Sequence, residues 1–85
     1  MTADLEAVLL GLLAERGKGR TICPSEVARA VAGSDPERWG KLMHPVRRLA
    51  VELMKQGRIV IVRKGRPVDP GDFRGVYRIR LPDAD

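Results

Sequence analysis

Residues 58–81 read RIVIVRKGRPVDPGDFRGVYRIRL, and this stretch decides the fold. Its two ends, 58–63 and 76–81, are apolar runs rich in β-branched residues, of the kind that form strands. The second run alternates, so that one face of the strand carries Tyr77, Ile79 and Leu81. The twelve residues between the runs are rich in proline, glycine and charge. The pattern predicts a β-hairpin with a long loop between its strands.

The loop, residues 64–75 (KGRPVDPGDFRG), carries a turn signal of its own. Residues 69–72 read DPGD and predict a type II turn, with proline at the second position and glycine at the third. We expect Arg66 or Arg74 to pair with one of the two aspartates and to stiffen the loop. Phe73 lies in this polar segment and is expected to fold back over the hairpin.

Helical periodicity dominates the chain before the hairpin. Apolar residues recur at helical spacing over residues 3–16, 24–32 and 36–56, and a brief strand is expected at 20–22. A glycine follows each of the three helical segments, and glycine commonly ends a helix because it adopts left-handed backbone conformations without strain.

Pro45 interrupts the third helical segment. A proline inside a helix removes one hydrogen bond and clashes with the preceding turn. Two alternatives remain open: one kinked helix, or two pieces at 36–42 and 44–56, of which we favour the second. Trp39 falls on the apolar stripe of this segment, so packing in the core is a better interpretation than stacking on an unpaired base.

The order of these elements is helix, short strand, helix, helix, strand, long loop and strand. That is the order of a winged helix-turn-helix domain, in which a three-helix core is followed by a C-terminal β-hairpin wing. The fold class is therefore α+β and mostly α, and the two-piece alternative adds a short helix before Pro45. No linker or composition shift divides the chain, so residues 1–85 are expected to form a single winged-helix domain.

Four motifs resemble a known family of small bacterial proteins. They are ICPSEVAR at 22–29, WGKLMHPVR at 39–47, KGRPVDP at 64–70 and FRG at 73–75. The resemblance covers about residues 5–80, and the family is known only as a domain of unknown function. It implies a bacterial, cytosolic protein with a winged-helix-like fold. It implies no activity, so function has to be argued from the residues.

The net charge of +5 is unevenly distributed. Residues 58–80 hold seven Lys and Arg against two Asp and Glu, a balance of +5, so the excess positive charge lies mainly on the hairpin. A basic patch of this kind favours an anionic partner, most often nucleic acid. The alternative is solvated surface charge with no partner. We predict binding to double-stranded DNA and a function in transcriptional regulation, with the target sequence left open.

In a helix-turn-helix protein, the last helix enters the major groove, and a wing can reach phosphates or the adjacent minor groove. The helix face away from the core and the loop together supply the candidate nucleic-acid-binding residues His44, Arg47, Arg48, Lys64, Arg66 and Arg74. An ordinary solvated face is the alternative for the helix arginines. Asp69 and Asp72 weaken contact with DNA at the loop tip, because phosphates repel carboxylates.

No catalytic, metal or cofactor site is visible in the sequence. The single cysteine, Cys23, excludes an intramolecular disulfide and a cysteine-rich zinc site, and it fits a reducing cytoplasm. Cys23 and His44 lack a third residue that would orient a nucleophile and its base. We therefore expect no enzymatic activity, no cofactor and no metal. The apolar run in residues 3–16 is too short to span a bilayer, so no membrane partner is expected.

A protein–protein interaction module with no nucleic-acid role is the alternative function. Winged helices also serve as scaffolds, and a fold does not by itself determine a function. The acidic residues of the loop tip favour this alternative. The chain is expected to be a monomer or a homodimer, with residues 3–16 as the candidate dimer surface because Leu10 lies off the main apolar stripe.

Overall fold

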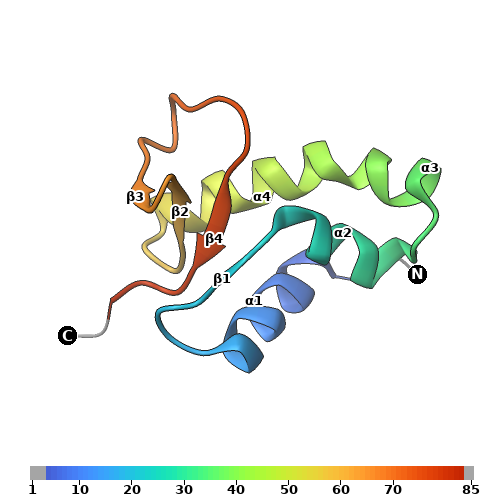
Figure 1. The fold of residues 1–85 in the computed structure, drawn as a ribbon, viewed down its shortest axis with the longest axis horizontal. Helices are drawn as coiled ribbons and strands as arrows, with labels where there is room; N and C mark the ends of the chain where they lie inside the picture. The colour runs from blue at the N-terminus through green and yellow to red at the C-terminus, as the bar shows by residue number, and fades with distance from the viewer. Residues whose placement is uncertain (1–3, 84–85) are drawn as a thin grey trace.

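The computed structural model describes residues 4–83 (Figure 1). The elements that the sequence predicts follow one another in the expected order, and one further strand lies between the last two. Its helical elements are α1 (Leu5–Arg16), α2 (Pro24–Ala32), α3 (Pro36–Trp39), the 3-10 turn η1 (Gly40–Leu42) and α4 (Met43–Lys55). Its strands are β1 (Thr21–Ile22), β2 (Val60–Arg63), β3 (Arg66–Pro67) and β4 (Arg78–Arg80). The helices and the antiparallel sheet form a winged-helix-like α+β fold, which confirms the expected fold class.

The last strand of the chain, β4, lies inside the sheet, whose strand order is β1-β4-β2-β3. Ile79 lies opposite Ile22 on one side and opposite Ile61 on the other, and all three side chains are 0% exposed. A row of three β-branched side chains therefore lines the buried face of the sheet. The alternation predicted for this strand is confirmed, with Tyr77 buried and Val76 exposed.

The three longer helices pack against the sheet and contact one another, and α4 lies above α1 and α2 in the view of Figure 1. Burial of each large aliphatic side chain contributes about 1.5–3 kcal/mol to the free energy of unfolding. The helices supply the buried residues Leu9, Leu13, Val27, Ala28, Val46, Ala50 and Leu53.

Over residues 4–83, no helix combines the length and the apolar character needed to cross a membrane.

The first helix begins at Leu5, and its expected start at residue 3 lies outside the described residues. The Asp4 carboxylate accepts a hydrogen bond from the Glu6 N–H at 3.0 Å, which satisfies one of the free amides of the first turn. Leu10 is half-buried and packs against the core. The position that made this helix a candidate dimer surface is therefore used within the protein.

The third helical segment consists of two pieces, as favoured, but the break lies before Pro45 rather than at it. The first piece ends at Trp39, and η1 tightens the next three residues before α4 begins at Met43. Pro45 is then the third residue of α4, in the first turn, where an amide has no helical partner to lose. Trp39 is half-buried against the core, as expected, and the Arg29 guanidinium lies 5.1 Å from its ring centroid.

The chain after β2 is not one long tip, because it begins with a tight hairpin. Lys64 and Gly65 have φ angles of 51° and 79°, the left-handed conformation that a two-residue type I′ turn requires. They join β2 to β3, in which Pro67 lies opposite Val62 at the edge of the sheet. Proline is tolerated in an edge strand, where its missing N–H need not face a partner. The sequence does not predict β3, since two residues that include a proline give no strand signal.

The turn predicted at the loop tip is present but is not type II. The Asp72 N–H donates to the Asp69 carbonyl at 3.0 Å, which closes the turn. Gly71 does not adopt the positive φ that type II requires, and its N–H donates instead to the Asp69 carboxylate at 2.9 Å. The expected pairing of Arg66 or Arg74 with these aspartates is wrong, since within the described residues neither arginine makes an ion pair.

A polar link joins α1, β1 and the start of α2. The Arg16 guanidinium donates to the Glu26 carboxylate at 2.5 Å and to the Thr21 carbonyl at 3.0 Å. The second Glu26 oxygen accepts from the Cys23 N–H at 2.7 Å, as in a capping box. The Arg16 contact first, and the Cys23 N–H second, hold the pKa of the Glu26 carboxyl below its ordinary value.

We predict that Glu26 contributes to the loss of stability in acid. Its pKa is lowered in the folded state, so the unfolded chain takes up the proton first as the pH falls below about 5. Stability is full above the pKa of the unfolded state and declines as the pH falls through the folded value. In urea unfolding, Glu26→Gln should lose up to about 1 kcal/mol at neutral pH and show a flatter acid dependence.

Glu37→Gln is the matched control for this measurement. Glu37 also lies in a helical first turn, and within residues 4–83 no ion pair engages its carboxylate. Its substitution should leave the acid dependence of the wild type in place. Wild-type acid dependence in Glu26→Gln would mean that other carboxylates produce the effect.

Candidate nucleic-acid interface

The exposed face of α4 carries two of the predicted residues. His44 and Arg48 lie one turn apart and are exposed, whereas Val46 and Ala50 on the opposite face are buried. The expectation that His44 and Arg48 point away from the core is therefore confirmed. Glu52 follows one turn later and is also exposed, so a carboxylate separates the positive first two turns of this face from Lys55 in the last turn.

Arg47 does not lie free on this face. Its guanidinium donates to the Phe73 backbone carbonyl at 2.5 Å, and its Cζ lies 3.9 Å from the centroid of the Phe73 ring. The centroid of the Tyr77 ring is 5.9 Å away. A planar guanidinium can stack on a ring while donating hydrogen bonds in its own plane, which an ammonium cannot do. Arg47 is therefore a contact between α4 and the loop before β4, a role that the sequence does not predict.

The two aromatic side chains at this guanidinium are buried. Phe73 is 7% exposed and Tyr77 is 6% exposed, and their rings meet edge-on with centroids 5.4 Å apart. Phe73 folds back over the hairpin, as predicted. Between them the chain turns at Gly75, whose φ is +83° and where a Cβ atom would lie 3.1 Å from the Arg63 guanidinium. Only glycine meets both conditions without strain.

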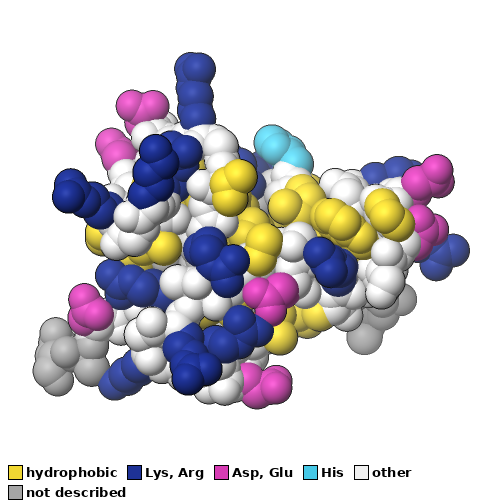
Figure 2. Space-filling view, in the orientation of Figure 1, with side chains coloured by type: hydrophobic (Ala, Val, Ile, Leu, Met, Phe, Trp, Pro, Cys, Tyr) yellow, Lys and Arg dark blue, Asp and Glu magenta, His cyan; other side chains and the backbone are white. Residues whose placement is uncertain are grey.

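The other predicted residues lie on the wing, which we define as residues 64–75. Lys64, Arg66 and Arg74 are exposed, and over residues 4–83 no ion pair engages any of them. Figure 2 shows Lys and Arg side chains gathered over the sheet and the wing, while a hydrophobic strip crosses the same view toward α3. The wing therefore carries three cationic side chains outside any described ion pair, together with the carboxylates of Asp69 and Asp72 at its tip.

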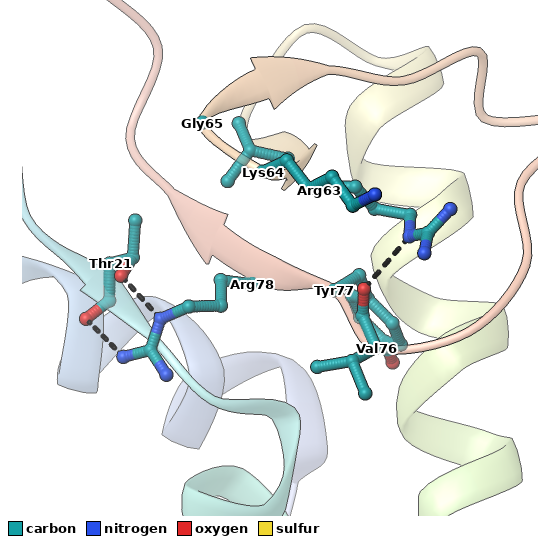
Figure 3. Close-up of a pocket in the computed structure, with 8 residues that line it drawn as sticks. Thr21, Arg63, Lys64, Gly65, Val76, Tyr77 and Arg78 are labelled. Carbon is teal, nitrogen blue, oxygen red and sulfur yellow. Dashed lines mark hydrogen bonds between the residues drawn. The ribbon is translucent and has the colours of Figure 1, made fainter.

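Two neighbouring arginines are engaged by the sheet (Figure 3). Arg63 donates through Nε to the Val76 carbonyl at 2.9 Å, and Arg78 donates through Nε to the Thr21 hydroxyl at 2.6 Å. The two side chains turn in opposite directions beside a hollow of about 410 Å³ that Tyr77 also lines. Their charges add to the positive field of the wing, but their guanidiniums already have hydrogen-bond partners.

The remaining chemistry at this surface is limited. Within the described part of the chain, no three His, Cys, Asp or Glu side chains come together as metal ligands would. Cys23 is half-buried just before α2, and its sulfur lies 3.0 Å from the Ser25 hydroxyl. Beside the hydrophobic strip, the surface offers a partner positive charge and hydrogen-bond donors.

The fold and this surface define a class of protein: a winged-helix-like α+β protein whose basic wing is fastened to its last helix. The chain belongs to the family described as Protein of unknown function (DUF3253), whose family model matches residues 2–82. This confirms the resemblance to a domain of unknown function. A comparison with curated proteins gives no match. The family description assigns no activity, so function is argued from the geometry.

We predict that the hydroxyl of Tyr77 destabilises the fold. Its oxygen is buried and has no hydrogen-bond partner among the described residues, a situation that costs about 1–3 kcal/mol. Tyr77→Phe keeps the ring and its contact with Phe73. The variant should therefore raise the free energy of unfolding at neutral pH by about 1 kcal/mol, measured by chemical denaturation. A lower value than that of the wild type would contradict the prediction.

The same variant has a signature at high pH. Burial raises the pKa of the Tyr77 phenol above its ordinary value of 10.0, although the Arg47 charge opposes the shift. As the pH rises above about 10, the unfolded chain ionises first, so the wild type loses stability in this range. Tyr77→Phe should lack this part of the loss. An identical alkaline dependence in both proteins would show that the phenol is not desolvated.

Proposed function

We propose that the protein binds double-stranded nucleic acid, DNA in particular, with the exposed face of α4 and the wing. One observation carries the proposal. Lysine and arginine side chains that form no described ion pair lie on both α4 and the wing, and a contact between Arg47 and Phe73 joins these two elements. We call these side chains the unpaired cationic residues; they are Arg48, Lys64, Arg66 and Arg74. Such a protein would act as a small transcriptional regulator in a reducing cytoplasm, to which the single cysteine is suited.

Phosphate contacts would supply most of the affinity of such a surface. Each neutralised phosphate releases condensed counterions, so affinity falls with salt at a log–log slope of about −0.9 per contact on duplex DNA. If each of the four unpaired cationic residues contacts one phosphate, the log–log slope is about −3 to −4. His44 and Arg48 stand on the first turns of α4, where a helix in the major groove presents side chains to base edges.

The two aspartates of the loop tip limit how the wing can approach DNA. Asp69 and Asp72 are exposed and close the turn between them. Because phosphates repel carboxylates, the tip should stay away from the backbone. Contacts then fall to Lys64 and Arg66 on one side of the tip and to Arg74 on the other.

One apolar feature favours a second candidate function, a protein–protein interaction module. Val76 is 83% exposed. It borders a hollow of about 360 Å³ that is also lined by Cys23, Pro24, Met43, Gly75 and Tyr77. A single exposed aliphatic side chain is ordinary, but apolar surface that continues into a hollow marks protein contact sites. None of the unpaired cationic residues lines this hollow, so the two functions can be tested separately.

We predict micromolar binding to duplex DNA at low salt, with an affinity that falls steeply as salt is added. Fluorescence anisotropy of a labelled duplex of random sequence, titrated at several salt concentrations, measures both quantities. Arg48→Glu in α4 and Lys64→Glu/Arg66→Glu in the wing should each weaken binding at least about tenfold. The salt slope should fall by about 1 in the first variant and by about 2 in the second.

The double variant Lys18→Glu/Arg20→Glu is the matched control for the wing variant. It reverses the same number of charges in the exposed connection between α1 and β1, on the side of the molecule opposite the wing (Figure 1). Its salt slope should match that of the wild type. Equal losses in the two double variants would reduce the binding to a net-charge effect. An absence of binding at low salt would contradict the proposal and favour the protein-interaction module.

A further inference from the structure

Arg47 and Phe73 each directly precede, in the sequence, one of the unpaired cationic residues. Arg47 precedes Arg48 on α4, and Phe73 precedes Arg74 on the wing. The hydrogen bond between them joins two points of the chain that are 26 residues apart. A contact that holds Phe73 against α4 therefore also determines where Arg74 can lie relative to Arg48.

This hydrogen bond is the link between α4 and the loop that leads to β4. Among the described hydrogen bonds, only that of Arg47 joins α4 to residues 68–77. The other long-range bonds of this loop reach the sheet, as when the Val68 N–H donates to the Ile61 carbonyl at 3.0 Å. Without the Arg47 side chain, the loop would stay attached to the sheet while its place beside α4 lost its only described hydrogen bond.

The contact is suited to hold a fixed spacing. The Arg47 guanidinium is half-buried, bonded to a carbonyl and stacked on a ring that is itself 7% exposed. Charged hydrogen bonds are stronger than neutral ones, and cation–π contacts strengthen where water is excluded. The Phe73 ring packs edge-on against the ring of Tyr77, the residue directly before β4, and both rings are buried.

We propose that Arg47 is a positioning residue that makes this surface selective for the regular phosphate array of a duplex over flexible polyanions. The inference rests on the proposed function and deepens it. A duplex presents phosphates at a fixed spacing, whereas single-stranded DNA and heparin can adapt their charges to many cationic surfaces. Holding Arg74 relative to Arg48 before binding lowers the entropy lost on a duplex. A polyanion that adapts its own shape gains little from that order.

The experiment compares the affinities for three probes: a labelled duplex, a single strand of the same length, and heparin. Arg47→Lys and Arg47→Ala should each lose about tenfold in affinity for the duplex and less than about twofold for the other two probes. The salt slope on the duplex should stay at the wild-type value, because no phosphate contact is removed. Arg48→Ala is the control that removes an exposed cationic side chain. It should weaken the binding of all three probes and lower the duplex slope by about 1.

The lysine variant is decisive, because it keeps the positive charge and removes the planar group. Wild-type duplex affinity in Arg47→Lys would overturn the proposal. So would an equal loss on all three probes in Arg47→Ala together with a smaller salt slope, since that pattern identifies a direct phosphate contact. A selective loss on the duplex in both variants, with an unchanged slope, is the expected result.

Hydrogen exchange of the free protein separates the two ways of failing. Arg47→Ala should speed the exchange of amides in residues 68–77 and leave the amides of α1 and α2 protected, which also shows that the variant is folded. If the wild type binds none of the probes, the proposed function fails, and the selectivity proposal fails with it. If the wild type binds but exchange in residues 68–77 is unchanged in Arg47→Ala, the positioning role alone is refuted.

Discussion

β4 pairs with a strand on each side, and this pairing determines the path of the chain around it. Ile79 lies opposite both Ile22 and Ile61, so the last strand enters the sheet between β1 and β2. The tight turn after β2 places β3 on the other side of β2. Residues 68–77 must therefore cross from one side of β2 to the other. The crossing segment adds no strand to the sheet and is held to it by single hydrogen bonds at its two ends. Its middle has a further attachment, which α4 provides.

That attachment combines a buried aromatic pair with a half-buried charge. Aromatic residues are only 4% of the chain, yet Phe73 and Tyr77 both belong to the crossing segment and to the main hydrophobic core. Arg47 covers them, and its half-buried charge is tolerable because the Phe73 carbonyl accepts a hydrogen bond from it. The Tyr77 hydroxyl has no equivalent partner among the described residues. The rings are thus held for their apolar surface, and one polar atom is left unsatisfied as a consequence.

Local patterns predicted the helices and the other strands of this fold, but neither β3 nor the contacts between the elements. The helix at 24–32 was predictable to the residue, because a proline and a glycine mark its two ends. The type II turn was not, because the Asp69 carboxylate bonds the Gly71 N–H in a different turn. Helical periodicity alone predicts that Arg47 is an exposed cationic residue. Its partial burial depends on Phe73, and no pattern along the sequence connects these two positions. The DNA contacts of the unpaired cationic residues stay predictions.

The lysine and arginine side chains of the hairpin fall into two groups: arginines that donate hydrogen bonds within the protein, and cationic side chains that face solvent. Of the seven Lys and Arg in residues 58–80, four donate hydrogen bonds to described partners: Arg58, Arg63, Arg78 and Arg80. An arginine serves this purpose because its planar fork reaches backbone carbonyls while its stem packs on the sheet. The net charge therefore overstates what a partner can neutralise. The three cationic side chains that remain, Lys64, Arg66 and Arg74, lie on the wing, which the contact between Arg47 and Phe73 joins to α4.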